Sequence, residues 1–156
     1  MSSPHEAQAA ELAAIAAGAG TRAARAERAA AWIAQVGGYR WVGLYHVGPT
    51  AIEVLGWAGP DAPTFPRFPR TAGLNGAAVA AGEPVIVQDV SRDARYLRTL
   101  GSTRAEMIMP IALRPGGPVV GTIDVESERA NAFSTRDLHL LGACAAALVP
   151  LWDGAV

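Results

Sequence analysis

Two pairs of β-rich runs constrain the fold of this chain more than any other feature. The first pair covers 40–48 and 51–59, and the second covers 105–113 and 118–127. Turns rich in glycine and proline join the two runs of each pair. Connections this short join antiparallel neighbours, because a parallel crossover needs a dozen or more residues. The sequence therefore predicts an antiparallel sheet that contains two hairpins.

Alanine-rich and leucine-rich runs predict four helices. Thr21 and Ser134 are suitable caps for two of them, because their hydroxyl groups can accept a hydrogen bond from a free backbone N–H. The predicted helices cover 4–17, 21–36, the short stretch 73–81 and the run that starts at 134. One further strand is expected after the short helix, at 84–90.

A proline-rich segment, 59–73, separates the first hairpin from the short helix. Proline lacks the backbone N–H that a strand donates, so we expect a loop outside the sheet. Hairpins with helices that must cover one face indicate an α+β fold. It would have an antiparallel sheet of five or six strands, helices mainly on one face and a loop-roofed pocket on the other. We expect a helical extension at 1–20 and a single domain at 21–156.

Charge and residue usage exclude several classes of function. The formal net charge is −1 and all 13 basic residues are scattered arginines, so no nucleic acid partner is expected. The lack of lysine excludes lysine-dependent phosphate-binding loops and Schiff-base chemistry. The longest apolar run is too short for a bilayer, and Glu6 and Glu11 do not suit a signal peptide. We therefore expect no membrane association and a cytoplasmic location.

Residues that bind metals or carry redox chemistry are sparse. Cys144 is the one cysteine, which excludes an intramolecular disulfide and a multi-thiolate site. Its helical spacing with neighbouring leucines predicts a place on an apolar helix face, where a thiol is inert. His5, His46 and His139 lack the spacing of metal ligands, so no metal and no cofactor are expected.

Alternation along the predicted strands brings candidate site residues to one face. Trp41 and Tyr45 share a face of the first strand, and Asp124 and Glu126 share a face of the last one. Glu106 starts the neighbouring strand, and a register that pairs position 112 with position 118 would place it opposite Asp124. Three carboxylates would then meet. The alternative is that these acids simply face water on the uncovered side of the sheet.

Five segments together resemble the GAF domain family over roughly 21–152. They are WVGLY (41–45), GLNGAAVAAGEPVIVQDVSRDARYL (73–97), AEMIMPIAL (105–113), GTIDVES (121–127) and FSTRDLHLL (133–141). The resemblance implies a GAF-like fold, with the short helix and the strand after it beside a ligand pocket.

Within that family the chain resembles the stand-alone free methionine-(R)-sulfoxide reductases. AEMIMP is similar to their SEIVVP, and IDVES is similar to their IDIDS. Those enzymes reduce the sulfoxide through one cysteine, and another cysteine resolves the intermediate. Their three cysteine positions fall on Phe65, Asn75 and Thr99, none of which can supply a thiolate. We therefore expect no catalytic residues and no enzyme activity.

The resemblance also implies how a ligand would bind. The three carboxylates would receive a ligand ammonium group, and the two aromatic rings would pack against its apolar part. Arg67 and Arg70, in the proline-rich segment, could form a lid and pair with a ligand carboxylate, although a solvated loop is the alternative. The candidate ligand-binding residues are Trp41, Tyr45, Glu106, Asp124 and Glu126.

These features predict a stand-alone sensory or regulatory GAF domain that binds a cationic or zwitterionic metabolite, such as an amino acid. One alternative is a divergent free methionine-(R)-sulfoxide reductase. Another is a structural or dimerisation module whose pocket is filled by its own side chains, for example Phe65 and Phe68. Besides the ligand, we expect a signalling protein partner and a second copy of the chain, contacted by the terminal helices with Trp32 and Trp152.

Overall fold

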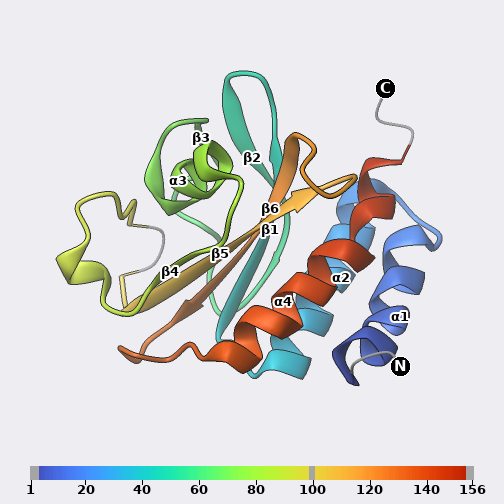
Figure 1. The fold of residues 1–156 in the computed structure, drawn as a ribbon, viewed down its shortest axis with the longest axis horizontal. Helices are drawn as coiled ribbons and strands as arrows, with labels where there is room; N and C mark the ends of the chain where they lie inside the picture. The colour runs from blue at the N-terminus through green and yellow to red at the C-terminus, as the bar shows by residue number, and fades with distance from the viewer. Residues whose placement is uncertain (1–3, 99–100, 154–156) are drawn as a thin grey trace.

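A six-stranded antiparallel sheet forms the centre of the computed structural model, which describes residues 4–98 and 101–153 (Figure 1). The strands lie in the order β3-β2-β1-β6-β5-β4, and every neighbouring pair is antiparallel. They are β1 (Trp41–Val47), β2 (Ala51–Ala58), β3 (Arg67–Pro69), β4 (Val85–Val87), β5 (Ala105–Ala112) and β6 (Val119–Ser127). The predicted α+β fold with two hairpins is confirmed.

The helices divide between the two faces of the sheet. Three long helices lie on one side of the sheet, where α2 and α4 pack against the strands and α1 packs against α2 and α4, while the short helix α3 lies on the other face (Figure 1). The helices are α1 (Pro4–Ala17), α2 (Arg22–Gly37), α3 (Gly73–Ala81) and α4 (Thr135–Ala147), with two 3₁₀ turns, η1 (Val90–Arg92) and η2 (Val149–Trp152). No helix in the described part of the chain is long and apolar enough to cross a membrane.

Local capping fixes the ends of two helices as the sequence predicts. The Thr21 hydroxyl accepts a hydrogen bond from the backbone N–H of Ala24 at 3.1 Å, and the C-cap of α2 is Gly38, which has a positive φ of 71°. At the start of α4, the carboxylate of Asp137 accepts a hydrogen bond from the backbone N–H of Ser134 at 2.8 Å.

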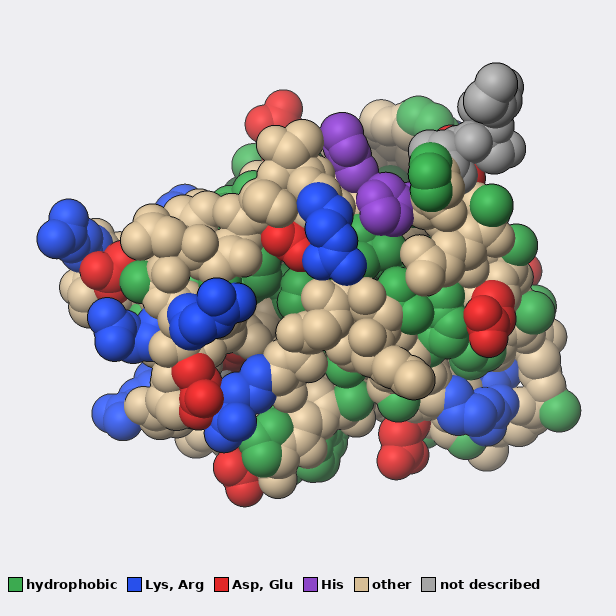
Figure 2. Space-filling view, turned by 90° about the horizontal axis from the view of Figure 1, so that it is seen from below, with side chains coloured by type: hydrophobic (Ala, Val, Ile, Leu, Met, Phe, Trp, Pro, Cys, Tyr) green, Lys and Arg blue, Asp and Glu red, His purple; other side chains and the backbone are tan. Residues whose placement is uncertain are grey.

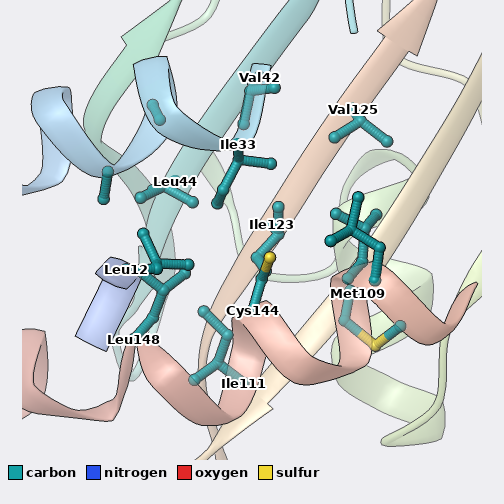
Figure 3. Packing of buried hydrophobic residues seen from close by; sticks show 14 of the residues in the cluster. Leu12, Ile33, Val42, Leu44, Met109, Ile111, Ile123, Val125, Cys144 and Leu148 are labelled. Carbon is teal, nitrogen blue, oxygen red and sulfur yellow. The ribbon is translucent and has the colours of Figure 1, made fainter. Parts of the chain in front are cut away.

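The main hydrophobic core lies between the sheet and the three long helices (Figure 3). Val42 and Leu44 point into it from β1, while Leu12 of α1 belongs to the same cluster. Cys144 is fully buried there, and burial raises the pKa of its thiol to about 12. The prediction that Cys144 is an inert core residue is therefore supported, because a thiol with that pKa stays protonated at neutral pH.

Helix α2 approaches β2 so closely that one strand position requires glycine. A Cβ on Gly56 would lie 2.5 Å from the backbone nitrogen of Glu27 and 2.7 Å from the carbonyl carbon of Ala26. The buried face of α2 is built mainly of alanines, so the helix backbone can rest against the strand.

The structure corrects two sequence predictions about the sheet. The proline-rich segment contributes β3, in which Phe68 pairs with Ile52 of β2. Prolines are tolerated there because β3 is an edge strand, and the carbonyl of Pro66 still accepts a hydrogen bond from Val54 at 2.8 Å. In the second hairpin, Ala112 pairs with Val119 instead of position 118, and the register shifts again between Ile111 and Ala112.

Two glycine substitutions test these packing arguments. Gly142 is exposed in α4, and a Cβ there would meet nothing within 4 Å. We expect Gly142→Ala to raise the free energy of unfolding by about 0.5–1 kcal/mol, because alanine loses less backbone entropy in a helix. Gly56→Ala should instead lower it by about 1–3 kcal/mol, because α2 would have to move. Urea unfolding of both variants measures this, and a stable Gly56→Ala protein would contradict the close packing of α2.

Candidate functional site

Three buried carboxyl groups, here called the carboxylate cluster, meet on the sheet face opposite the long helices. Glu106 comes from β5, and Asp124 and Glu126 come from β6. Their exposed fractions are 2%, 0% and 2%, and one oxygen atom from each lies within 4.8 Å of the others. Glu106 pairs with Glu126 and not with Asp124, which corrects the predicted register. The carboxyl groups still meet, because residues two apart on a strand share a face.

Hydrogen bonds satisfy only part of the carboxylate cluster. The Asn75 side-chain amide donates to Asp124 Oδ2 at 3.0 Å, and the Thr103 hydroxyl donates to Glu126 Oε1 at 2.8 Å. Asp124 Oδ1 and Glu126 Oε2 are buried and accept no hydrogen bond from an amide or hydroxyl donor among the described residues. The Glu106 carboxyl group, when it holds a proton, hydrogen-bonds with both Asp124 and Glu126. Buried polar atoms normally have partners, so two oxygens without an amide or hydroxyl donor in one cluster need an explanation.

Sequence reasoning missed Asn75 as a member of the site and treated it only as a replaced cysteine position. It is 6% exposed, and its Oδ1 accepts a hydrogen bond from the hydroxyl of Thr122 at 2.6 Å. One signal was present in the sequence, because Asn75 is the only residue of α3 with a polar side chain. A polar residue in an otherwise apolar helix that packs on a sheet needs a buried partner.

Burial changes the acidity of all three carboxyl groups. It raises the pKa of Asp124 to about 6. Burial, together with repulsion from Asp124, raises the pKa of Glu126 to about 9. The pKa of Glu106 is raised well above its ordinary value by burial first and then by the charges of Asp124 and Glu126. At neutral pH the cluster therefore holds protons unless a cation offsets the repulsion.

Two aromatic residues of β1 lie beside the acids of β6, one on each side of the position that pairs with Asp124. Trp41 is the strand partner of Glu126, and Tyr45 is the partner of Thr122. Between them lies Gly43, the partner of Asp124, where a Cβ would lie 2.5 Å from the Trp41 ring and 2.7 Å from the Tyr45 ring. Glycine at this position therefore lets both rings lie close to the carboxylate cluster. The Trp41 indole also donates to the Asp61 carbonyl oxygen at 3.0 Å.

On the face where a loop-roofed pocket is predicted, other side chains cover the acids. Phe68 of β3 is buried and packs edge-on against Tyr45, with a ring-centroid distance of 5.6 Å. Phe65, in contrast, is 42% exposed. Three surface cavities in the described part of the chain lie elsewhere: about 930 Å³ between α1 and α4, about 590 Å³ at the outer side of α3, and about 500 Å³ between α2 and β2.

The two arginines of the predicted lid lie away from the carboxylate cluster. Arg67 is on β3 and forms an exposed ion pair with Glu53 at 2.9 Å. Arg70 donates to the Gly48 carbonyl oxygen at 3.0 Å and lines the 590 Å³ cavity at the outer side of α3, together with Arg95. Their role as a lid stays a prediction.

The arrangement suits cation binding better than redox chemistry. Carboxylate oxygens can hold a divalent cation or accept hydrogen bonds from an ammonium group, and the carboxylate cluster is compact enough for either. Sequence reasoning considered only the histidines as metal ligands and did not consider these three acids. Cys144 lies on the opposite face of the sheet. Of the three positions that the resemblance assigns to the reductase cysteines, Phe65 is exposed, Asn75 binds Asp124, and Thr99 lies outside the described residues.

The raised carboxyl pKa values predict how stability depends on pH. A raised folded-state pKa means that the stability contribution is complete below the unfolded pKa of about 4 and is lost as pH rises. For Asp124 the loss runs through a folded pKa of about 6. We expect Asp124→Asn to gain about 3 kcal/mol relative to the natural protein between about pH 4 and pH 8. Urea unfolding at both pH values measures this difference, and a pH-independent difference would contradict the buried acid.

Comparisons with known proteins place these features in a family. The GAF domain model matches residues 9–149. The structure of a free methionine-R-sulfoxide reductase from Neisseria meningitidis, solved in complex with its substrate, is 26% identical, with a TM-score of 0.80. It covers 98% of this chain and 93% of that chain. A type II free methionine-R-sulfoxide reductase from Thermoplasma acidophilum is also 26% identical, with a TM-score of 0.75 and coverage of 90% and 94%.

Curated relatives match over a shorter region. GAF domain-containing protein A of Dictyostelium discoideum is 30% identical over 98 residues, which are 62% of this chain and 60% of that protein. The protein YtsP of Bacillus subtilis is 26% identical over 97 residues, or 58% of its length. The chain thus spans about three fifths of the length of the curated relatives that it matches. The family match covers most of the chain and agrees with the observed fold, so this chain belongs to the GAF domain family.

Proposed function

We propose that this GAF domain is a non-catalytic binding module for a small cationic or zwitterionic metabolite, such as a free amino acid. The observation that carries the proposal is the pair of carboxylate oxygens, Asp124 Oδ1 and Glu126 Oε2, that accept no hydrogen bond from an amide or hydroxyl donor among the described residues. A ligand ammonium group would donate hydrogen bonds to both. It would also offset the repulsion within the carboxylate cluster, which the protein alone relieves only by holding protons.

The surroundings of the carboxylate cluster support an amino acid more than a bare cation. Trp41 and Tyr45 lie beside the acids and offer ring surface for an apolar side chain. The structural neighbour from Neisseria meningitidis is a reductase of a free amino acid derivative, solved with its substrate. The ligand would enter only when part of the cover over the acids moves, because these acids are almost fully buried.

The reductase alternative would need reactive cysteines, and the residues of this chain do not supply them. Sulfoxide reduction needs a thiolate that attacks sulfur and a second thiol that resolves the intermediate. Asn75 occupies one of the corresponding cysteine positions and is engaged with Asp124. Burial raises the pKa of the Cys144 thiol to about 12, and Cys144 belongs to the core on the other side of the sheet. The alternative of a self-filled pocket draws support from Phe68 alone, because Phe65 is exposed.

A ligand screen by thermal shift tests the binding function. We expect a free amino acid at a hundred times its dissociation constant to raise the Tm by roughly 5–10 °C, equivalent to about 2.7 kcal/mol. The panel contains free L-amino acids and methionine-(R)-sulfoxide, and each hit is repeated with its N-acetyl form, which lacks the ammonium charge. Asp124→Asn should keep the fold and lose the shift.

Two results would count against this function. An N-acetyl amino acid that stabilises the protein as well as the free one would remove the role of the acids. A screen without any hit would favour the self-filled module. Consumption of methionine-(R)-sulfoxide with thioredoxin as reductant would show that the domain is an enzyme after all.

We also propose that a second copy of the chain binds the groove between α1 and α4. Ala10 and Ala13 of α1 and Ala143 of α4 line this cavity of about 930 Å³, and histidine side chains lie at its surface beside hydrophobic ones (Figure 2). Glu6 and His139 also line it, and a two-fold arrangement would place the same groove residues of both copies against one another. The predicted contribution of Trp152 is wrong, because its side chain is 4% exposed and packs in the protein's own core.

Gly142, which lines the same groove, provides a matched test of this dimer. Gly142→Arg should convert a dimer into a monomer, because a long charged side chain would enter the contact, whereas Gly142→Ala should leave the dimer intact. Light scattering after size-exclusion chromatography measures both masses. A natural protein that is monomeric at every concentration would rule out this contact.

A further inference from the structure

Asn75 supplies the carboxylate cluster with the kind of donor that a ligand would supply. Its side-chain N–H donates to Asp124 Oδ2 at 3.0 Å. The opposite end of the same amide is held by Thr122, whose hydroxyl donates to Asn75 Oδ1 at 2.6 Å. This second hydrogen bond fixes the orientation of the amide, so its nitrogen faces the acid and its oxygen faces the threonine. The protein thus carries an internal substitute for part of a ligand.

The helix that carries Asn75 is attached to the sheet by few groups. Leu74 and Ala78 are its buried apolar residues, in the cluster with Val87 and Ile108, and the half-buried Val79 packs against the cluster around Tyr45. Its other buried side chain is that of Asn75. The helix has nine residues, too few to be stable without tertiary contacts. Asn75 therefore accounts for the polar part of the attachment of α3.

Both ends of α3 are built for a change of backbone direction. Gly73 at its start has a φ of 69°, and Gly82 at its end has a φ of 66°, in the region that favours glycine. The N-cap residue, Ala72, provides no side-chain hydrogen bond to the helix. The outer side of α3 lines the 590 Å³ surface cavity, so this side of the helix is not packed against another layer of the protein.

We propose that Asn75 is a latch that holds α3 over the carboxylate cluster and selects for cationic ligands. In the ligand-free protein its amide occupies a donor position at Asp124, and a ligand reaches the acids when it displaces this amide and the first turn of α3 moves away. The selection for a cation rests on the proposed function, whereas the latch is a property of the ligand-free chain.

Hydrogen-bond strength explains the selection. A neutral donor, such as water or an uncharged amide, offers Asp124 no more than the neutral amide of Asn75 already does. An ammonium group forms charge-assisted hydrogen bonds, which are about twice as strong, and it can also reach the two oxygens of Asp124 and Glu126 that have no amide or hydroxyl donor among the described residues. Only a charged donor therefore gains enough to displace the latch. In this view Asn75 sets the ligand specificity of the site without being a ligand contact.

Hydrogen exchange tests the latch without any ligand. Asn75→Ala removes both hydrogen bonds, and Thr122→Val removes the hydroxyl that orients the amide at nearly constant volume. We expect backbone amides of 73–82 to exchange about tenfold faster in both variants, with β5 and β6 unchanged. Thr122→Ser keeps the hydroxyl and should behave like the natural protein. Unchanged exchange in α3, or an equal increase throughout the sheet, would overturn the latch.

A titration with methylammonium chloride, followed by thermal shift, tests the selection. We expect methylammonium to bind Asn75→Ala about tenfold more tightly than the natural protein, because no internal donor competes. Acetamide, a neutral amide of similar size, should not stabilise the natural protein. Weaker methylammonium binding in Asn75→Ala would make Asn75 a ligand contact and overturn the latch. If α3 loosens but neither protein binds methylammonium, the latch stands and the proposed function fails.

Discussion

The removal of three carboxyl groups from water is the constraint on which the rest of this structure depends. Glu106, Asp124 and Glu126 lie between two apolar clusters, one around Tyr45 and Phe68 and one around Leu74 and Ile108. Buried charge is costly unless it is paired, so the protein relieves the cost with protons and a few neutral donors. A domain that only needed to fold would be more stable with apolar residues at these positions, which makes the acids an indication of function.

The two faces of the sheet separate the main hydrophobic core from the proposed binding site. On one face, alternate residues of β1 and β6, such as Leu44 and Ile123, join the core under the long helices. On the other face, the intervening residues form the carboxylate cluster and its aromatic flank, covered by the small helix α3. Most of the apolar burial therefore lies away from the site. The cover of the site can move without opening the main core, because different layers carry the two roles.

The sequence predicted the fold and the faces well, because they follow from strand alternation and short turns. Trp41 and Tyr45 share a face of β1, and Asp124 and Glu126 share a face of β6, whatever the exact register. The register itself depends on an irregularity between Ile111 and Ala112, which no local pattern revealed. The edge strand β3 was not predicted, because the prolines of its segment favour a loop. Asn75 was overlooked because its importance comes from contacts with Asp124 and Thr122, which are distant in sequence.

The irregularity between Ile111 and Ala112 lies next to the 113–118 turn, at the end of the hairpin far from Glu106. The length of this turn therefore affects the pairing register of β5 and β6, and with it the position of Glu106. A slip of one residue would turn Glu106 from the face of the carboxylate cluster into the hydrophobic core, and a slip of two would bring it opposite Asp124. Insertions or deletions in this turn would thus change which acids lie opposite one another without replacing any of the three residues. The length of the turn thus sets where Glu106 lies relative to Asp124 and Glu126. In relatives with the same three acids but a different turn length, we therefore expect a different ligand preference.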